Sequence, residues 1–355
     1  MAYKLLVGGY TQGGLRVVTF DPSNNKLDLQ STGIPVGPDP SWIVQHPRDS
    51  SLILATSEVE DGKLHVIRLK DGEELSGEVL TSVSSGGTYP AHLLVLDDSI
   101  VTGNYMGGSI LDIPYSLGPV SVKDHGSEKA QGVHIQFSGT GPNPDRQESS
   151  HPHEVYLHGN ELLIPDLGAD KTWRLVKGDS GWEIKGAIEY PAGSGPRHVL
   201  IHDGILYTVL ELSNEIALHK FVALPETPSP IAVLSTFASG SPADPSMLAA
   251  EILLSPDKRF IYVSNRNDPS PEGDTLAVYT VHSDKQECKL VNEIRTGVKH
   301  ARGMKFSKDG TYLAVAGSHT GSLKIFKVVE GSSNGEVTAV ASVEGLEKPT
   351  AVVWL

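Results

Sequence analysis

Four side chains in this sequence have the chemistry of proton transfer and anion binding. His153 carries an imidazole, the side chain whose charge changes near neutral pH, and Glu211 can share a proton or orient a cation. Arg197 and Arg266 carry guanidinium groups that hold carboxylate or phosphate. Because two arginines directed into one cavity need an anionic partner, these residues predict a catalytic site for a negatively charged small molecule.

All four residues occupy one of two recurring places in a repeated unit, the start of its first strand or the end of its second strand. Each unit begins with a small or polar residue and a short apolar strand, and a second apolar strand follows that ends in a polar residue. Residues 196–200 and 206–211 form one copy, and residues 249–253 and 261–266 form the next. Units of about 50 residues with short strands are typical of β-propeller blades. The first positions of the seven copies are Ser41, Ala91, His153, Arg197, Ala250, Arg302 and Thr350.

The seventh copy stops after one strand, at residues 349–355. Its missing partner is the apolar strand at residues 4–10. A C-terminal strand that completes the blade begun at the N-terminus leaves no open sheet edge. We therefore predict an all-β fold, a seven-bladed β-propeller closed by pairing of its N- and C-terminal strands, with residues 1–355 forming a single domain.

Composition agrees with an all-β chain and narrows the functional classes. The 355 residues include 37 Gly and 23 Pro, and the apolar residues fall in short runs bounded by turn residues. A net charge of −14 argues against nucleic acid and anionic membranes as partners, and no apolar run approaches the roughly 18 residues that span a bilayer. Cys288 is the only cysteine, and the N-terminus lacks the pattern of a signal peptide. These features predict a cytoplasmic protein, and a homo-oligomer is compatible with them.

The polar ends of the second strands should meet the first positions at one end of every blade. Antiparallel pairing of the first two strands places the start of one beside the end of the other. Buried polar groups in propeller blades also bond neighbouring strands, and we assign Asn104, Asp166, Asn265 and Ser318 to that structural role. The complete set of strand ends is Glu58, Asn104, Asp166, Glu211, Asn265, Arg266 and Ser318.

Metal binding has two weaker signals. His151 and His153 form an H-x-H pair, but zinc needs at least a third ligand. Four of the strand ends offer oxygen atoms of the kind that calcium prefers. They are Glu58, Asn104, Asp166 and Glu211. We predict neither a metal nor a cofactor.

Residues 123–150 form a long segment rich in glycine and serine, without a clear strand pattern. Loops of this length are typical of lids, partner surfaces or disordered segments.

Several motifs resemble the propeller-type 6-phosphogluconolactonase family, and together they cover essentially the whole chain. The fungal carboxy-cis,cis-muconate cyclases are similar relatives on the same fold. The motifs are Asn104–Ser109, Asp145–Gln147, Ser150–Val155, Pro165–Asp170, Gly195–His198, Glu251–Ile252, Ser255–Asp257 and Tyr262–Arg266.

The resemblance implies roles for individual residues. The active-site histidine, arginines and glutamate of the cyclases fall on His153, Arg197, Arg266 and Glu211, which we take as catalytic. In the sixth unit the family usually has a proline before Arg302 and an asparagine at the end of the second strand, and this chain has neither. The substrate-binding candidates are His151, Arg146, Glu251, Arg302 and His198, of which the first and third fit the lactonase pattern better than the cyclase pattern.

The motifs favour hydrolysis of an anionic sugar-acid lactone similar to 6-phosphogluconolactone. Arg197 and Arg266 would hold the anionic group or stabilise the developing oxyanion, while His153 would activate water. Glu211 would orient His153 or position the water, and the choice of base between the two stays open. We expect both arginines to be exposed at the channel mouth, so that alanine substitution there lowers turnover and leaves folding intact.

Two other classes of function remain alternatives. An intramolecular lyase of the muconate-cyclase type would use the same arginines to hold substrate carboxylates, with His153 or Glu211 moving a proton to carbon. A non-catalytic propeller that binds partners needs no organised charge cluster, so the motifs weigh against it.

Overall fold

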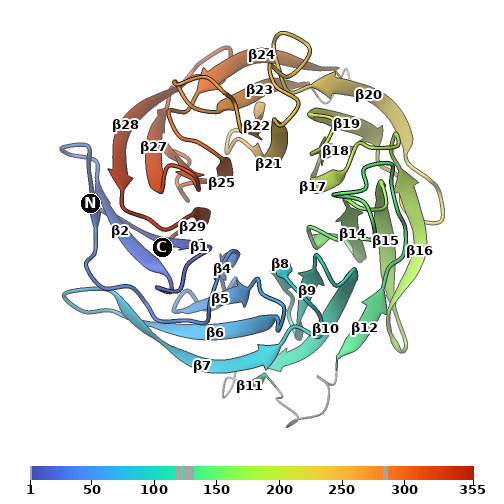
Figure 1. Ribbon diagram of the computed structural model, residues 1–355, viewed down its shortest axis with the longest axis horizontal. Helices are drawn as coiled ribbons and strands as arrows, with labels where there is room; N and C mark the ends of the chain where they lie inside the picture. Colours follow the sequence, from blue (N-terminus) through green and yellow to red (C-terminus); the bar gives the residue numbers. More distant parts are fainter. Residues whose placement is uncertain (1, 117–120, 123–131, 283–286) are drawn as a thin grey trace. The chain divides into compact units, whose positions relative to one another are not determined.

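The computed structural model describes residues 2–116, 121–122, 132–282 and 287–355. Within these ranges the chain forms 29 strands in seven sheets, six of them four-stranded and one five-stranded (Figure 1). No helix in them is long and apolar enough to cross a membrane. The prediction of an all-β, seven-bladed β-propeller is confirmed.

Three sheets contain the strands up to residue 136 together with the last strand of the chain. The sheet that joins the chain ends contains, in order of pairing, β29 (Pro349–Trp354), β1 (Tyr3–Gly9), β2 (Arg16–Asp21) and β3 (Lys26–Leu29). The next contains β4 (Ile43–Gln45), β5 (Leu52–Ser57), β6 (Lys63–Lys70) and β7 (Ser76–Ser84). The five-stranded sheet contains β8 (Pro90–Val95), β9 (Ser99–Asn104), β10 (Ser109–Ser116) and β11 (Ser121–Val122), with β12 (Val133–Gln136) also paired to β10.

The remaining four sheets follow the chain in sequence order. The first contains β13 (Tyr156–His158), β14 (Glu161–Asp166), β15 (Lys171–Gly178) and β16 (Gly181–Glu189). The second contains β17 (Pro196–His202), β18 (Ile205–Leu210), β19 (Glu215–Lys220) and β20 (Ser229–Ser235). The third contains β21 (Leu248–Leu254), β22 (Phe260–Arg266), β23 (Thr275–His282) and β24 (Glu287–Arg295). The fourth contains β25 (Ala301–Phe306), β26 (Tyr312–Gly317), β27 (Ser322–Val328) and β28 (Val337–Glu344).

Burial explains why the second strand of each repeat stands out in the sequence. The strands β5, β9, β14, β18, β22 and β26 are buried at every residue. The fourth strands, such as β7 and β20, are largely exposed or half-buried. A strand covered on both faces requires a continuous run of apolar and small residues, which is the pattern that the repeat displays.

The predicted pairing of the first two strands in each repeat is confirmed. Its register determines which residues of the candidate site lie next to each other. Pro196 of β17 lies opposite Leu210 of β18. Leu248 of β21 lies opposite Arg266 of β22, and Ala301 of β25 lies opposite Gly317 of β26. The start of each first strand is therefore beside the end of the second strand.

The chain divides into two compact units. The C-terminal unit comprises Met1–Leu5, Val18–Leu29 and Pro196–Trp354. The N-terminal unit comprises Leu6–Val17, Gln30–Gly195 and Leu355. The single domain at residues 1–355 stays a prediction.

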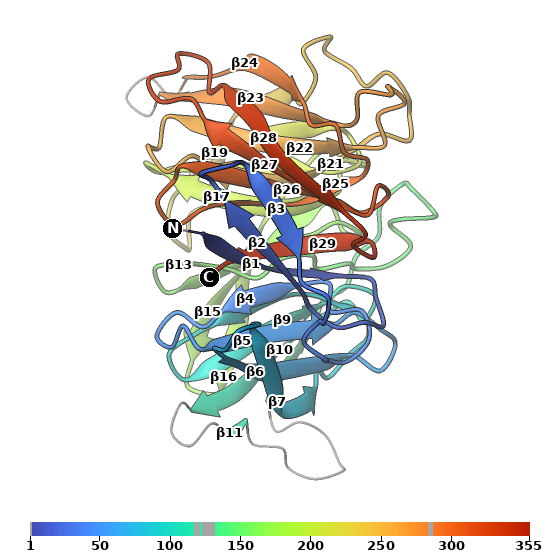
Figure 2. The same ribbon diagram turned by 90° about the vertical axis from the view of Figure 1, so that its left-hand side faces the viewer.

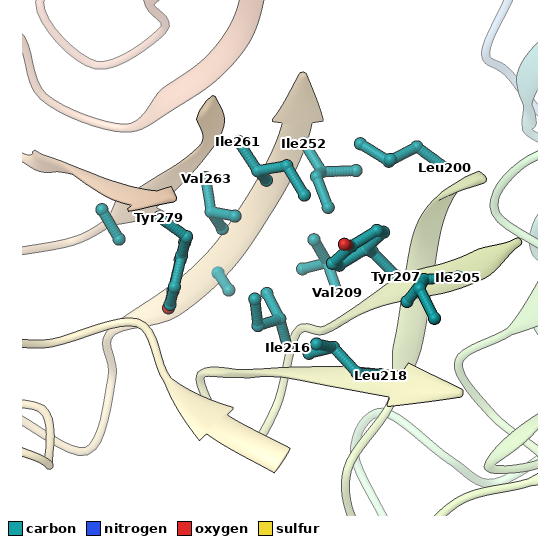
Figure 3. Close-up of a cluster of buried hydrophobic side chains, with 12 residues drawn as sticks. Leu200, Ile205, Tyr207, Val209, Ile216, Leu218, Ile252, Ile261, Val263 and Tyr279 are labelled. Carbon is teal, nitrogen blue, oxygen red and sulfur yellow. The ribbon is translucent and has the colours of Figure 1, made fainter. Parts of the chain in front are cut away.

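An apolar core joins the sheet β17–β20 to the sheet β21–β24 within the C-terminal unit. Tyr207 and Val209 of β18 belong to the same buried cluster as Ile261 and Val263 of β22 (Figure 3). Branched aliphatic and aromatic side chains of this kind have few rotamers, and dense packing holds them in place. The cluster therefore fixes the ends of β18 and β22 relative to each other.

Aromatic packing supports the strand that completes the first sheet. Figure 2 shows β29 beside β1, with β2 and β3 following in the same sheet. The ring of Tyr3 packs edge-on against Trp354 and Tyr312, with 5.5 Å between ring centroids in both pairs. Nε1 of Trp354 also donates a hydrogen bond to the carbonyl of Lys305 at 3.0 Å. Edge-to-face contacts are a favoured geometry for aromatic pairs, so this cluster stabilises the closing strand.

The expectation for residues 123–150 was wrong in part. Residues 123–131 lie outside the described residues. The strand β12 lies within the segment, and Ile135 pairs with Ile110 of β10. The buried Gln147 donates from Nε2 to the carbonyl of Leu167 and to Oδ1 of Asp170. The described part of the segment is thus attached to the sheets.

Trp354→Ala should destabilise the fold by about 3–5 kcal/mol, because it removes a buried aromatic side chain and leaves a cavity. Urea unfolding followed by circular dichroism measures the loss. The control is Val233→Ala on β20, at a residue that is 45% exposed. The free energy of unfolding of this variant should differ from that of the wild type by no more than about 0.5 kcal/mol. Equal stability of the two variants would show that the closing strand contributes little.

Candidate functional site

A carboxylate shared by two arginines is the centre of the candidate site in the C-terminal unit. Oε2 of Glu211 lies 2.9 Å from Nε of Arg197 and 2.8 Å from Nη2 of Arg266. Arg197 is the second residue of β17, Glu211 directly follows β18, and Arg266 ends β22. The structure therefore brings together three of the four residues predicted to be catalytic.

The backbone at the start of β21 holds this group in place. Nη1 of Arg197 donates to the carbonyl of Ala250 at 2.7 Å, and Nη2 of Arg266 donates to the carbonyl of Ala249 at 2.9 Å. The amide of Ala249 donates in turn to the carbonyl of Glu211 at 3.2 Å. Both guanidinium groups are thus oriented by fixed main-chain acceptors as well as by the carboxylate.

The expectation that the two arginines are exposed was wrong. Arg197 is 2% exposed, Arg266 is 5% exposed and Glu211 is 1% exposed. The mutual pairing of these side chains permits their burial. Alanine substitution would break a buried ion pair, so it tests folding together with activity.

Positive charge exceeds negative charge among the groups that act on Arg197. The pKa of Arg197 is lowered to about 10, chiefly by burial and also by the charges of Arg266 and Arg302, while the charges of Glu211 and Glu251 oppose the shift. Arg197 therefore stays charged at neutral pH. Three arginines face two carboxylates, and an anionic ligand would offset the difference.

His198 and Glu251 form a second buried pair beside Arg197. Nδ1 of His198 lies 2.7 Å from Oε1 of Glu251, which also accepts from the amide of Ile252 at 3.0 Å. Burial lowers the pKa of His198, against the opposing charge of Glu251. Burial alone would raise the pKa of Glu251, but the charge and hydrogen bond of His198 and the charge of Arg197 lower it overall. Both groups have partners in the protein, and their substrate-binding role stays a prediction.

The other candidates lie in the N-terminal unit, around the ring of Tyr105. That ring stacks on His151 with 4.7 Å between centroids, and it meets His153 edge-on at 5.5 Å. Nη2 of Arg146 lies 3.4 Å from the Tyr105 hydroxyl. The structure thus brings Arg146, His151 and His153 together in this unit.

Both ring nitrogens of His151 face acceptors. Nδ1 lies 3.0 Å from the carbonyl of Tyr105, and Nε2 lies 2.9 Å from Oε1 of Glu148. A carbonyl and a carboxylate oxygen are both hydrogen-bond acceptors, so acceptors of the protein occupy both ring nitrogens of His151. His151 therefore has no free nitrogen for zinc. In the described residues no group of three His, Cys, Asp or Glu side chains is arranged to hold a metal ion.

Hydrogen bonds confirm the structural role predicted for three strand ends. Nδ2 of Asn104 donates to the carbonyl of Ser85, and Nδ2 of Asn265 donates to the carbonyl of Thr236. The carboxylate of Asp166 accepts hydrogen bonds from four donors. They are Oγ of Ser150, the amides of His151 and Ala169, and Nε1 of Trp173.

Sequence reasoning did not single out Tyr105 or His300. Tyr105 directly follows Asn104, a predicted strand end, and its ring contacts His151 and His153. His300 directly precedes β25 and hydrogen-bonds to Asn267, the residue after β22. Each lies one residue beyond an aligned repeat element, and this adjacency is the signal that could have identified them.

The fold defines the chain as a seven-bladed β-propeller. The family model described as "Lactonase, 7-bladed beta-propeller" matches residues 4–354, and the chain belongs to this family.

Two curated relatives that match this chain over nearly its full length are named as 6-phosphogluconolactonases. The chain is 28% identical to a probable 6-phosphogluconolactonase of Arthroderma benhamiae, with 100% of this chain and 89% of the relative covered. It is 26% identical to the 6-phosphogluconolactonase of Bacillus subtilis, with 98% and 97% covered. The solved structure of a periplasmic gluconolactonase from Pseudomonas aeruginosa is similar in fold, with a TM-score of 0.84 at 21% identity and 100% and 99% coverage.

Glu211→Gln should destabilise the fold by about 3–5 kcal/mol, because it leaves two buried arginines without their carboxylate. Inorganic phosphate should raise the melting temperature of this variant more than that of the wild type, since a bound anion replaces the lost charge. The control is Glu148→Gln, which removes a carboxylate that is 46% exposed beside His151. The free energy of unfolding of this variant should fall by less than about 1 kcal/mol. A Glu211→Gln variant as stable as the wild type would contradict the charge argument.

Proposed function

We propose that this protein is a lactonase that hydrolyses an anionic sugar-acid lactone such as 6-phosphogluconolactone. The observation that carries the proposal is the buried pair of arginines on one carboxylate, with a surplus of positive charge around it. Membership of the lactonase family and the names of the two full-length relatives support it.

Lactone hydrolysis needs stabilisation of a negative charge that develops on the carbonyl oxygen. Water attacks the carbonyl carbon, the tetrahedral oxyanion collapses, and the ring C–O bond breaks to give a carboxylate and a hydroxyl group. A guanidinium group carries more N–H donors than the contacts of Arg197 to Glu211 and Ala250 consume. The remaining donors would bind the oxyanion or the anionic substituent of the substrate.

Glu211 is better suited to positioning than to proton transfer. Its Oε2 lies within 3 Å of both guanidinium groups, so this oxygen is committed to the arginines. The sequence left the choice of base open between Glu211 and His153, and we assign water activation to His153. Glu211 orients the donors of the two arginines.

The direct test offers the purified protein 6-phosphogluconolactone and carboxymuconate in separate reactions. We expect consumption of the lactone above its spontaneous rate and no consumption of the muconate. Consumption of the muconate alone would assign the chain to cyclisation. Consumption of neither would contradict the proposal.

Arg266→Lys should lower kcat for the lactone by about 10²–10³-fold, because lysine keeps the charge beside Glu211 but loses the planar array of donors. The matched control is Arg174→Lys on β15, where a buried arginine pairs with Glu161 away from the candidate residues. That variant should lose stability in unfolding measurements and keep kcat per folded molecule. Equal kcat values for both variants and the wild type would remove Arg266 from the reaction.

Extensive EDTA treatment should leave lactone hydrolysis within about twofold of its starting rate, because the arginines supply the positive charge that a Lewis-acid ion would otherwise provide. Rates measured before and after chelation, and after readdition of calcium or zinc, check this. Loss of activity that either ion restores would contradict metal independence.

A further inference from the structure

His300 lies beside the arginine cluster of the C-terminal unit, because it hydrogen-bonds to Asn267, the residue that follows Arg266. Its tautomer is defined by this contact. Nδ1 of His300 lies 2.8 Å from Oδ1 of Asn267, whose Nδ2 donates to the carbonyl of Ser246 at 2.9 Å. Because Nδ2 must face that carbonyl, the amide of Asn267 presents its oxygen to His300. An amide oxygen only accepts, so Nδ1 of His300 carries the proton and Nε2 of the neutral ring is a bare acceptor.

The surroundings of the ring keep its orientation fixed. His319 stacks on it with 4.2 Å between centroids and 28° between planes. His300 and Asn267 both have left-handed backbone conformations, with φ of 59° and 64°. Such conformations cost free energy in residues other than glycine and concentrate at functional sites. Among the described residues none donates a hydrogen bond to Nε2 of this half-buried ring.

Burial keeps His300 neutral, and the charges of the nearby arginines act in the same direction. The pKa of His300 is lowered to about 3, chiefly by burial and also by the charges of Arg266, His319 and Arg302, while the charge of Glu211 opposes the shift. A nitrogen with so low a pKa is a poor general base at neutral pH, since it holds a proton only weakly. Its remaining capacity is to accept a hydrogen bond from a neutral donor.

We propose that Nε2 of His300 accepts a hydrogen bond from a substrate hydroxyl group and thereby selects polyhydroxylated sugar acids over anions without hydroxyls. The proposal rests on the proposed function and specifies its substrate class. The arginines recognise the negative charge, which a sugar acid and a muconate share. A bare nitrogen lone pair repels carboxylate oxygens and needs a donor, which among these substrates only the hydroxyl groups provide.

The expected discrimination follows from the cost of leaving a polar group without a partner. A site that hydrogen-bonds a substrate hydroxyl group binds analogues without this group more weakly. The difference in affinity is largest where the site is fully desolvated. For one half-buried acceptor we expect about a 10-fold to 100-fold difference in affinity.

The test measures equilibrium binding, so it does not depend on turnover. Calorimetry compares 6-phosphogluconate with 6-phosphonooxyhexanoate, which has the same charged groups and chain length but no hydroxyls. The wild type should bind the hydroxylated ligand at least about 10-fold more tightly. In His300→Phe, which retains a ring to stack on His319, affinity for 6-phosphogluconate should fall about 10-fold and affinity for the hexanoate should stay within about twofold.

Two further variants separate hydrogen bonding from packing. His300→Gln can donate its amide to Asn267 and present its oxygen in place of Nε2, so it should restore most of the preference for 6-phosphogluconate. His319→Phe keeps the stack without changing the acceptor, so it should leave the preference unchanged.

Equal binding of both ligands by the wild type, or equal losses for both ligands in His300→Phe, would overturn the assignment of His300. The lactone turnover assay of the wild type decides the proposed function independently. Active hydrolysis combined with equal binding would leave the lactonase intact and remove the hydroxyl contact. Absence of binding of either ligand would overturn the hydroxyl contact, and the turnover assay would then decide the lactonase proposal separately.

Discussion

The carboxylate of Glu211, held between Arg197 and Arg266, is the interaction on which the candidate site depends. Burying these charges is tolerated because they pair with one another and because the carbonyls of Ala249 and Ala250 each accept a hydrogen bond from one of the arginines. The three charged residues come from the ends of β17, β18 and β22, which a shared apolar core holds in fixed relation. Small shifts between these sheets would separate the charges, so packing of the core and chemistry of the site are coupled.

The surplus of positive charge has two consequences in the C-terminal unit. It favours a negatively charged ligand, and it keeps nearby imidazoles neutral. His198 and His300 both have lowered pKa values, for which burial is the main cause and the arginine charges a further one. A neutral imidazole beside a cation can still accept or donate a hydrogen bond. In the proposed scheme the arginines therefore bind the negative charge of the ligand, and a neutral imidazole binds its hydroxyl group.

The N-terminal unit contributes a different arrangement, in which an aromatic ring organises the histidines. Tyr105 contacts both His151 and His153, and Glu148 occupies the second nitrogen of His151. His151 is therefore committed to its protein partners. Of the two histidines in the H-x-H pair, His153 is the one to which the proposed proton transfer is assigned.

The sequence by itself determined the fold and the set of strand ends that carry the candidate residues. Apolar runs mark the buried second strands, and antiparallel pairing then places Arg197 beside the end of β18, next to Glu211. Only the tertiary structure decided that the arginines are buried, that His151 pairs with Glu148, and that His300 meets Asn267. These features arise from contacts between loops and between neighbouring sheets. Such contacts leave no periodic pattern in the sequence, because they depend on where separate segments pack and on which hydrogen-bond partners burial leaves to each polar group.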